Sequence, residues 1–132
     1  MLSLEPGTLP GEGYRQRQIA EQIYQQGVRD FAAMTLLPKA LRTPLAEQYR
    51  ISEFEKAQAF VSDDGSVKYL FTLFDGQKTE AVYMPYKNRK TICISSMVGC
   101  PAGCTFCATG KMGFGRNLTA AEILDQILFA AH

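Results

Sequence analysis

The stretch that decides the fold runs from Thr91 to Ile127 and reads TICISSMVGCPAGCTFCATGKMGFGRNLTAAEILDQI. It opens on an apolar run, residues 91–96, whose composition predicts a buried strand. Five of the chain's eleven glycines follow within residues 99–115. Because glycine clusters interrupt regular structure, we expect this segment to be a loop and not an element.

A helix is predicted to follow the loop. Thr119 and Glu122 have the T-x-x-E spacing of a capping box, and the apolar pattern continues to His132. The expected apolar side of this helix carries Ile123, Leu124, Ile127 and Leu128. A strand, a long loop and a helix in succession are typical of the first unit of a repeating β/α fold.

Upstream of this stretch the hydrophobic period changes to two. Alternating apolar residues in 54–61, 67–73 and 81–84 predict three strands. Asp64-Gly65 and Asp75-Gly76 separate them, and Asp-Gly pairs supply the positive φ angles that hairpin turns require. We therefore expect an antiparallel meander.

The first fifty residues are predicted to be helical. Residues 12–28 carry apolar side chains at helical spacing and stop near Gly27. Thr35 followed by Pro38 is typical of a capped helix start with proline in the first turn, and Pro44 is expected to begin a further short turn.

These segments predict an α+β chain in three parts. They are a small helical accessory domain (1–50), an antiparallel β segment (51–90), and the start of a β/α barrel with its cysteine loop (91–132). A complete eight-unit barrel needs roughly 250 residues, so 132 residues can hold only a truncated part of one.

Charge and hydropathy limit the possible partners. The net charge is only +1, but the window between Glu80 and Glu122 contains five basic and no acidic residues, which favours a phosphate-bearing partner. No apolar run approaches the ~20 residues that cross a bilayer, and the first residues lack a secretory signal. We expect a cytoplasmic protein without membrane contact.

All four cysteines lie within fifteen residues, at Cys93, Cys100, Cys104 and Cys107. Disulfides need an oxidising compartment, for which the sequence carries no address. Structural zinc normally takes four ligands in paired motifs, and Cys93 or the single histidine, His132, would have to complete the set. Three closely spaced cysteines instead favour a [4Fe-4S] cluster with one iron open to a small molecule. A zinc-binding RNA-interaction module without catalysis stays an alternative.

The motif C-x-x-x-C-x-x-C with Phe106 before its last cysteine resembles the signature of radical S-adenosylmethionine (SAM) enzymes. The longer string around it resembles the RlmN/Cfr family of RNA adenine-C2 methyltransferases, and Met-Val-Gly (97–99) and Gly-Phe-Gly-Arg-Asn-Leu (113–118) resemble its RlmN branch. The resemblance extends upstream through Lys68 to Phe71 and Glu80 to Pro85, so it covers nearly the whole chain.

This resemblance implies that Cys100, Cys104 and Cys107 hold a [4Fe-4S] cluster, and that S-adenosylmethionine binds the open iron beside Phe106. It implies 23S rRNA and tRNA as substrates and an external one-electron reductant. In the family, a methylated cysteine carries the methyl group to the adenine by a radical route. Glu80 corresponds to the proton acceptor and Cys93 to the cysteine that resolves the covalent RNA intermediate.

The chain also departs from the family. The segment with a Gly-Glu pair that binds S-adenosylmethionine, the further β/α units and the methyl-carrying cysteine have no counterpart before His132. We therefore expect this polypeptide alone to be inactive, with Leu124, Ile127 and Leu128 presenting apolar surface. A radical SAM enzyme with another substrate is a further alternative.

Overall fold

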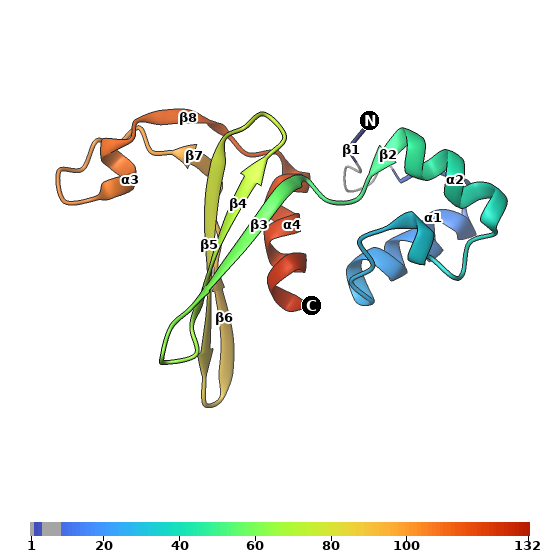
Figure 1. Cartoon of the computed structure of the whole chain (residues 1–132), viewed down its shortest axis with the longest axis horizontal. Helices are drawn as coiled ribbons and strands as arrows, with labels where there is room; N and C mark the ends of the chain where they lie inside the picture. Colours follow the sequence, from blue (N-terminus) through green and yellow to red (C-terminus); the bar gives the residue numbers. More distant parts are fainter. Residues whose placement is uncertain (1, 4–8) are drawn as a thin grey trace. The chain divides into compact units, whose positions relative to one another are not determined.

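A computed structural model describes residues 2, 3 and 9–132 of the chain (Figure 1). The described residues divide into two compact units. One runs to Glu53 and includes Ala131–His132, and the other is Phe54–Ala130. No helix in the described ranges is long and apolar enough to cross a membrane.

The first unit is helical, as predicted. Helix α1 (Tyr14–Ala20) continues into the π-helical segment η1 (Glu21–Gln25), and Gly27 reverses the chain with φ at 67°. A 3₁₀ helix, η2 (Phe31–Ala33), and helix α2 (Lys39–Gln48) follow. Two short strands, β1 (Leu2–Ser3) and β2 (Tyr49–Arg50), pair in parallel. The buried side chains of this unit are mainly Ile19, Ile23, Phe31, Met34 and Leu37.

The prediction that a helix begins at Thr35 and that Pro44 opens a separate turn is wrong. Pro38 precedes α2 without a side-chain cap, and Pro44 lies inside the helix. Segment 35–37 instead forms a turn held by Arg42, which donates hydrogen bonds to the carbonyl oxygens of Leu37 and Thr35. Proline removes one helical hydrogen bond, but its φ is compatible with a helix, so α2 continues through Pro44.

The second unit contains a four-stranded antiparallel sheet in the order β3-β4-β5-β6. The strands are β3 (Phe54–Val61), β4 (Val67–Leu73), β5 (Lys78–Tyr86) and β6 (Arg89–Cys93). Both Asp-Gly turns are confirmed, since Gly65 and Gly76 have φ of 82° and 81°. In each turn the aspartate accepts a hydrogen bond from the backbone N–H two residues later.

The run 91–96 is not the buried strand that its composition predicts. Strand β6 already begins at Arg89, ends at Cys93 and forms the last strand of the sheet. It pairs antiparallel with β5, and Cys93 is exposed. Pairing with β5 extends the hairpin beyond the polar turn at Lys87, which the apolar composition of the run alone does not indicate.

Helix α4 (Ala120–Ala131) covers one face of the sheet (Figure 1). Its capping box is confirmed: Thr119 N–H donates to Glu122 Oε2 at 2.8 Å, and Glu122 N–H donates to Thr119 Oγ1 at 3.2 Å. Phe129 packs edge-on against Phe71, with ring centroids 5.3 Å apart. The buried apolar residues at the centre of this core are Phe54, Phe71, Leu73, Ala81 and Leu118.

The predicted apolar side of α4 is only partly right. Its buried residues are Ala121, Glu122, Asp125 and Gln126, whereas Ile127 is 37% exposed. Gln126 is buried because its side chain pairs with the backbone of Ser95, accepting from the N–H and donating to the oxygen, both at 2.9 Å. Specific polar partners therefore override the simple hydrophobic pattern.

Residues 99–115 are also more ordered than the predicted loop. Strand β7 (Met97–Gly99) pairs antiparallel with β8 (Phe114–Asn117), and a short helix, α3 (Ala108–Lys111), lies between them. The glycines permit this close pairing: Gly99 has φ of 72°, and a Cβ there would collide with the carbonyl oxygen of Gly113.

Candidate functional site: a cysteine loop beside an open sheet face

The three cysteines of the motif lie on the segment that β7 and β8 close at its base. Cys100 N–H donates to the carbonyl oxygen of Gly113 at 3.0 Å, so Cys100 sits where the loop begins and Gly113 where it ends. Gly103 has φ of 63° and provides the bend before Cys104. The backbone thereby returns the chain on itself between the first two cysteines.

A turn just before α3 brings the other two cysteines close along the backbone. Cys107 N–H donates to Cys104 O at 3.2 Å, and a Cβ on the buried Gly110 would lie 2.9 Å from Cys104 N. Only glycine allows α3 to approach the Cys104 backbone this closely. Cys107 precedes α3, and the backbone N–H groups of Gly110 and then Thr109 lower the pKa of its thiol. A lowered thiol pKa favours the thiolate that binds metals.

The thiol side chains themselves are not gathered. All four cysteines are free thiols. In the described residues, no group of three or more histidine, cysteine, aspartate or glutamate side chains is arranged to hold a metal. The donor set still fits an iron–sulfur cluster, because Cys100, Cys104 and Cys107 are thiols, are only partly buried, and lie on one glycine-bent loop.

A hollow of about 380 Å³ joins this loop to the sheet. Glu80 and Lys68 line it from β5 and β4, while Ala108, Thr109 and Met112 line it from α3 and the residues after it. The sequence separates Glu80 from Cys107 by more than one strand, yet the fold places Glu80 in the same hollow as the helix that starts just after Cys107.

The face of the sheet opposite α4 carries three rows of side chains, which we call the open face. Because directly paired residues in antiparallel strands point to the same side, the register defines each row. The rows are Lys56–Thr72–Lys78, Gln58–Leu70–Glu80 and Phe60–Lys68–Val82–Cys93. Glu80 and Cys93 therefore share one face of the sheet.

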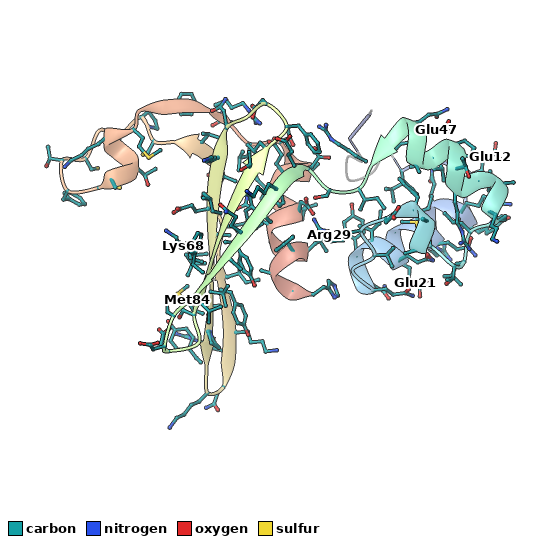
Figure 2. All side chains as sticks on the ribbon, in the orientation of Figure 1. Glu12, Glu21, Arg29, Glu47, Lys68 and Met84 are labelled. Carbon is teal, nitrogen blue, oxygen red and sulfur yellow. The ribbon has the colours of Figure 1, made fainter. Side chains whose placement is uncertain are left out.

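Lys68 and Glu80 form an ion pair on the open face, with Nζ 3.3 Å from Oε1 and both side chains about half exposed. Lys68 also lies 5.8 Å from the centre of the Phe60 ring. Figure 2 shows Lys68 and Met84 projecting from the sheet away from α4. The Glu80 carboxylate is thus held by a cation while staying accessible.

The structure does not bring every expected site residue into the hollow. Cys93 is on the same face as Glu80 but is not among the lining residues, and Phe106, at 92% exposure, contacts solvent. Ser95 does reach the site, donating its hydroxyl to Glu80 O at 2.7 Å. The sequence does not indicate this role of Ser95, because its hydrogen bond joins residues 15 positions apart in the chain.

Arg116, which no sequence pattern singles out as a site residue, organises the base of the cysteine loop. From β8, Arg116 Nε donates to Asp75 Oδ2 at 2.7 Å, and its Nη atoms donate to both Glu122 oxygens at 2.6 and 2.8 Å. The guanidinium holds the pKa of both carboxyl groups below their usual values. The T-x-x-E box was the only signal, and it did not reveal the arginine.

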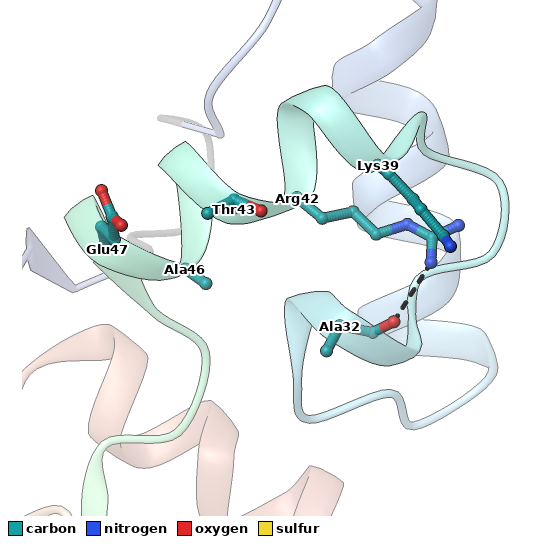
Figure 3. Close-up of a pocket in the computed structure, with 6 residues that line it drawn as sticks. All are labelled: Ala32, Lys39, Arg42, Thr43, Ala46 and Glu47. Atoms are coloured by element: carbon teal, nitrogen blue, oxygen red, sulfur yellow. Dashed lines mark hydrogen bonds between the residues drawn. The ribbon is translucent and has the colours of Figure 1, made fainter.

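A second hollow, of about 430 Å³, lies in the helical unit and is lined by Lys39 and Arg42 among others (Figure 3). Arg42 donates to the carbonyl oxygens of Ala32, Leu37 and Thr35. Since these bonds occupy its guanidinium, Arg42 serves the fold of this unit.

The fold, with its three-cysteine loop beside an antiparallel sheet, matches a solved structure of a known class of enzyme. A crystal structure described as a radical SAM methyltransferase from Sphaerobacter thermophilus superposes with a TM-score of 0.85 at 47% identity, covering 89% of this chain and 35% of that one. The chain is thus similar to part of a radical SAM methyltransferase.

The particular relatives are RlmN proteins. Residues 9–51 match the family described as "Ribosomal RNA large subunit methyltransferase N-terminal domain". The whole chain is 70% identical to 37% of the "Probable dual-specificity RNA methyltransferase RlmN" of Thermus thermophilus. It is 57% identical, over 99% of its length, to 38% of the protein of that name from Deinococcus deserti. The chain is therefore similar to the N-terminal portion of RlmN proteins, as the motifs predict, and spans little more than a third of their length.

Proposed function

We propose that this chain is the part of an RNA methyltransferase that binds the iron–sulfur cluster and accepts the substrate proton. The substrate is an adenosine in 23S rRNA or tRNA, modified at C2. The observation that carries the proposal is the shared hollow, in which Glu80 lies together with the helix that follows Cys107. The names of the relatives, dual-specificity RNA methyltransferases, support the RNA substrate.

In this proposal Cys100, Cys104 and Cys107 hold a [4Fe-4S] cluster, and S-adenosylmethionine binds beside it. When bound and reduced by an external one-electron donor, the pair supplies radical chemistry. The thiols reach the cluster by rotation of their side chains on the backbone already bent by Gly103 and α3. Phe106 is exposed enough to cover the nucleoside of the cofactor.

Glu80 accepts the proton lost from the adenine C2. A general base must be accessible to the proton it accepts, and Glu80 is half exposed, with the Lys68 ammonium 3.3 Å from its carboxylate. Cys93 is a free and exposed thiol on the same face. Its thiolate would attack the sulfur of the methyl-carrying cysteine of the full-length enzyme. The S–S bond forms as the bond from that sulfur to the RNA-bound CH2 group breaks, and the carbon keeps the electron pair and takes up a proton, which leaves a methyl group on the released RNA.

The fold leaves room for the remainder of a barrel. Strand β6 is the last in its sheet, so one of its edges has no partner strand in the described residues. Ile127 on α4 is exposed. We infer that β6 and α4 begin the barrel and that further β/α units pair with this edge. The 132-residue chain is accordingly expected to bind the cluster but to transfer no methyl group.

Metal analysis tests this proposal. After anaerobic reconstitution, we expect iron and sulfide in equal amounts and a broad visible absorption band from thiolate–iron bonding. Cys104→Ala should abolish this band, whereas Cys93→Ala should retain it as a matched control. Stoichiometric zinc in place of iron, or loss of the band in both variants, contradicts the assignment of three ligands and one free thiol.

A further inference from the structure

The open face of the sheet is strongly basic around Glu80. Lys56 and Lys78 lie in one row, Lys68 lies in another, and Arg89 lies near the hairpin end, whereas the only carboxylate in the three rows is Glu80. All four basic residues are exposed. The opposite face of the sheet is covered by α4, so the open face is the side of the sheet that a polyanion can reach.

The spacing of the rows places a lysine on either side of Glu80. Lys78 is two residues before Glu80 on β5, and Lys68 pairs with Val82, two residues after it. At roughly 3.3 Å per residue, the two lysine rows lie about 13 Å apart along the strands. Cations on either side of an accessible carboxylate can hold backbone phosphates on both sides of a nucleotide placed there.

The hollow between these lysines suits a nucleobase. Lys68 and Lys78 both line it, and Leu70, Met97 and Met112 provide apolar lining. In the outermost row, Phe60 is 50% exposed and offers a ring for stacking. Proteins usually bind single-stranded nucleic acid with cations that contact the phosphate backbone and aromatic rings that stack on the bases.

We propose that Lys56 and Lys78, together with Lys68, form a phosphate-binding track that leads single-stranded RNA across the open face to Glu80. Lys68 is already paired with Glu80, whereas Lys56 and Lys78 form no ion pair in the described part of the chain. Their ammonium groups are therefore available to phosphates. This inference deepens the proposed function and rests on it, because it assigns the RNA contacts of the same site.

The basic hairpin tip is the competing surface. Lys87 lies in the turn between β5 and β6, and Lys90 is the second residue of β6, paired with Pro85. Tyr86, where this turn starts, is six positions after Glu80 along an extended strand, which corresponds to roughly 20 Å. RNA held only at the tip would leave the hollow empty, so comparing the two lysine pairs tests the inference.

The test measures RNA affinity by fluorescence anisotropy with a short labelled single-stranded RNA. We expect the double variant Lys56→Gln/Lys78→Gln to weaken binding about ten-fold at 0.1 M salt. The slope of log affinity against log salt should fall by about 1.4, the value for two lost phosphate contacts. Lys87→Gln/Lys90→Gln, with the same loss of charge, should change the affinity less than about two-fold.

A second measurement does not depend on variants. Bound RNA should protect Lys56 and Lys78 of the unmodified chain from acetylation, as read by mass spectrometry, and leave Lys87 reactive. The inference is overturned if the chain binds no RNA, if both double variants weaken binding equally, or if only Lys87 is protected. These outcomes are separable from failure of the proposed function, because cluster loading is measured independently of RNA.

Discussion

Replacing Arg116 with methionine should destabilise the sheet unit and its cysteine loop. Methionine keeps an apolar stem but removes the guanidinium that joins β8 to Asp75 and Glu122. The Glu122 side chain is only 9% exposed, so Arg116→Met leaves its carboxylate without its main partner at a position that water hardly reaches. It keeps one hydrogen bond, from the backbone N–H of Thr119.

The size of the effect follows from the exposure of each partner. A charged hydrogen-bonded pair contributes ~1.5–3 kcal/mol, and the partial exposure of Arg116, at 31%, favours the lower half of that range for Glu122. The more exposed Asp75 adds at most about 1 kcal/mol. We therefore expect a loss of about 2–3 kcal/mol in the free energy of unfolding, which lowers the urea midpoint by roughly 1 M.

Urea unfolding followed by circular dichroism measures this loss, with Lys90→Met as a control at an exposed basic residue. The pH dependence gives a second check. The folded-state pKa of Glu122 is lowered by Arg116, so the stabilisation is present above the unfolded pKa near 4 and is lost as the pH falls through the folded value. The difference between wild type and Arg116→Met should shrink below about pH 4. Equal midpoints for Arg116→Met and Lys90→Met at neutral pH would refute the reasoning.

Two further predictions concern the site and its support. Gly110→Ala places a Cβ 2.9 Å from the backbone nitrogen of Cys104, so α3 must shift and the iron bound per chain should fall severalfold. Lys111→Ala, on the same helix, is the control and should bind iron normally. Equal iron in the two variants would contradict the close-packing argument. Gln126→Met leaves the N–H and carbonyl of Ser95 without their side-chain partner. This should lower the free energy of unfolding by about 2 kcal/mol and speed hydrogen exchange at the Ser95 amide. Unchanged exchange would show that the bond to Gln126 does not protect this amide.

Much of the local structure could be predicted from the sequence. The capping box at Thr119, the turns at Gly65 and Gly76 and the alternating strands are set by residues within four positions of each other. Their hydrogen bonds close over short distances, so the pattern and the structure agree. The cysteine spacing likewise indicates the radical SAM signature, and the longer string around it carries the resemblance to the RlmN/Cfr family.

The predictions that are wrong concern residues whose partners lie far away in the sequence. Composition could not show that β6 pairs with β5 at the edge of the sheet, or that Gln126 is buried against Ser95, 31 residues away. A polar residue is buried only if its partner is present, and that depends on the packing of other elements.

The sequence by itself determined the cysteine motif, the turns and strands of the meander, the capped helix and the resemblance to RlmN proteins. Each of these depends on residues that are close together in the chain. Only the tertiary structure decided that Glu80 shares a hollow with α3 and that lysines flank Glu80 on the open face. Strand register and sheet-to-loop packing bring these groups together, and both are set by contacts between residues far apart in the chain.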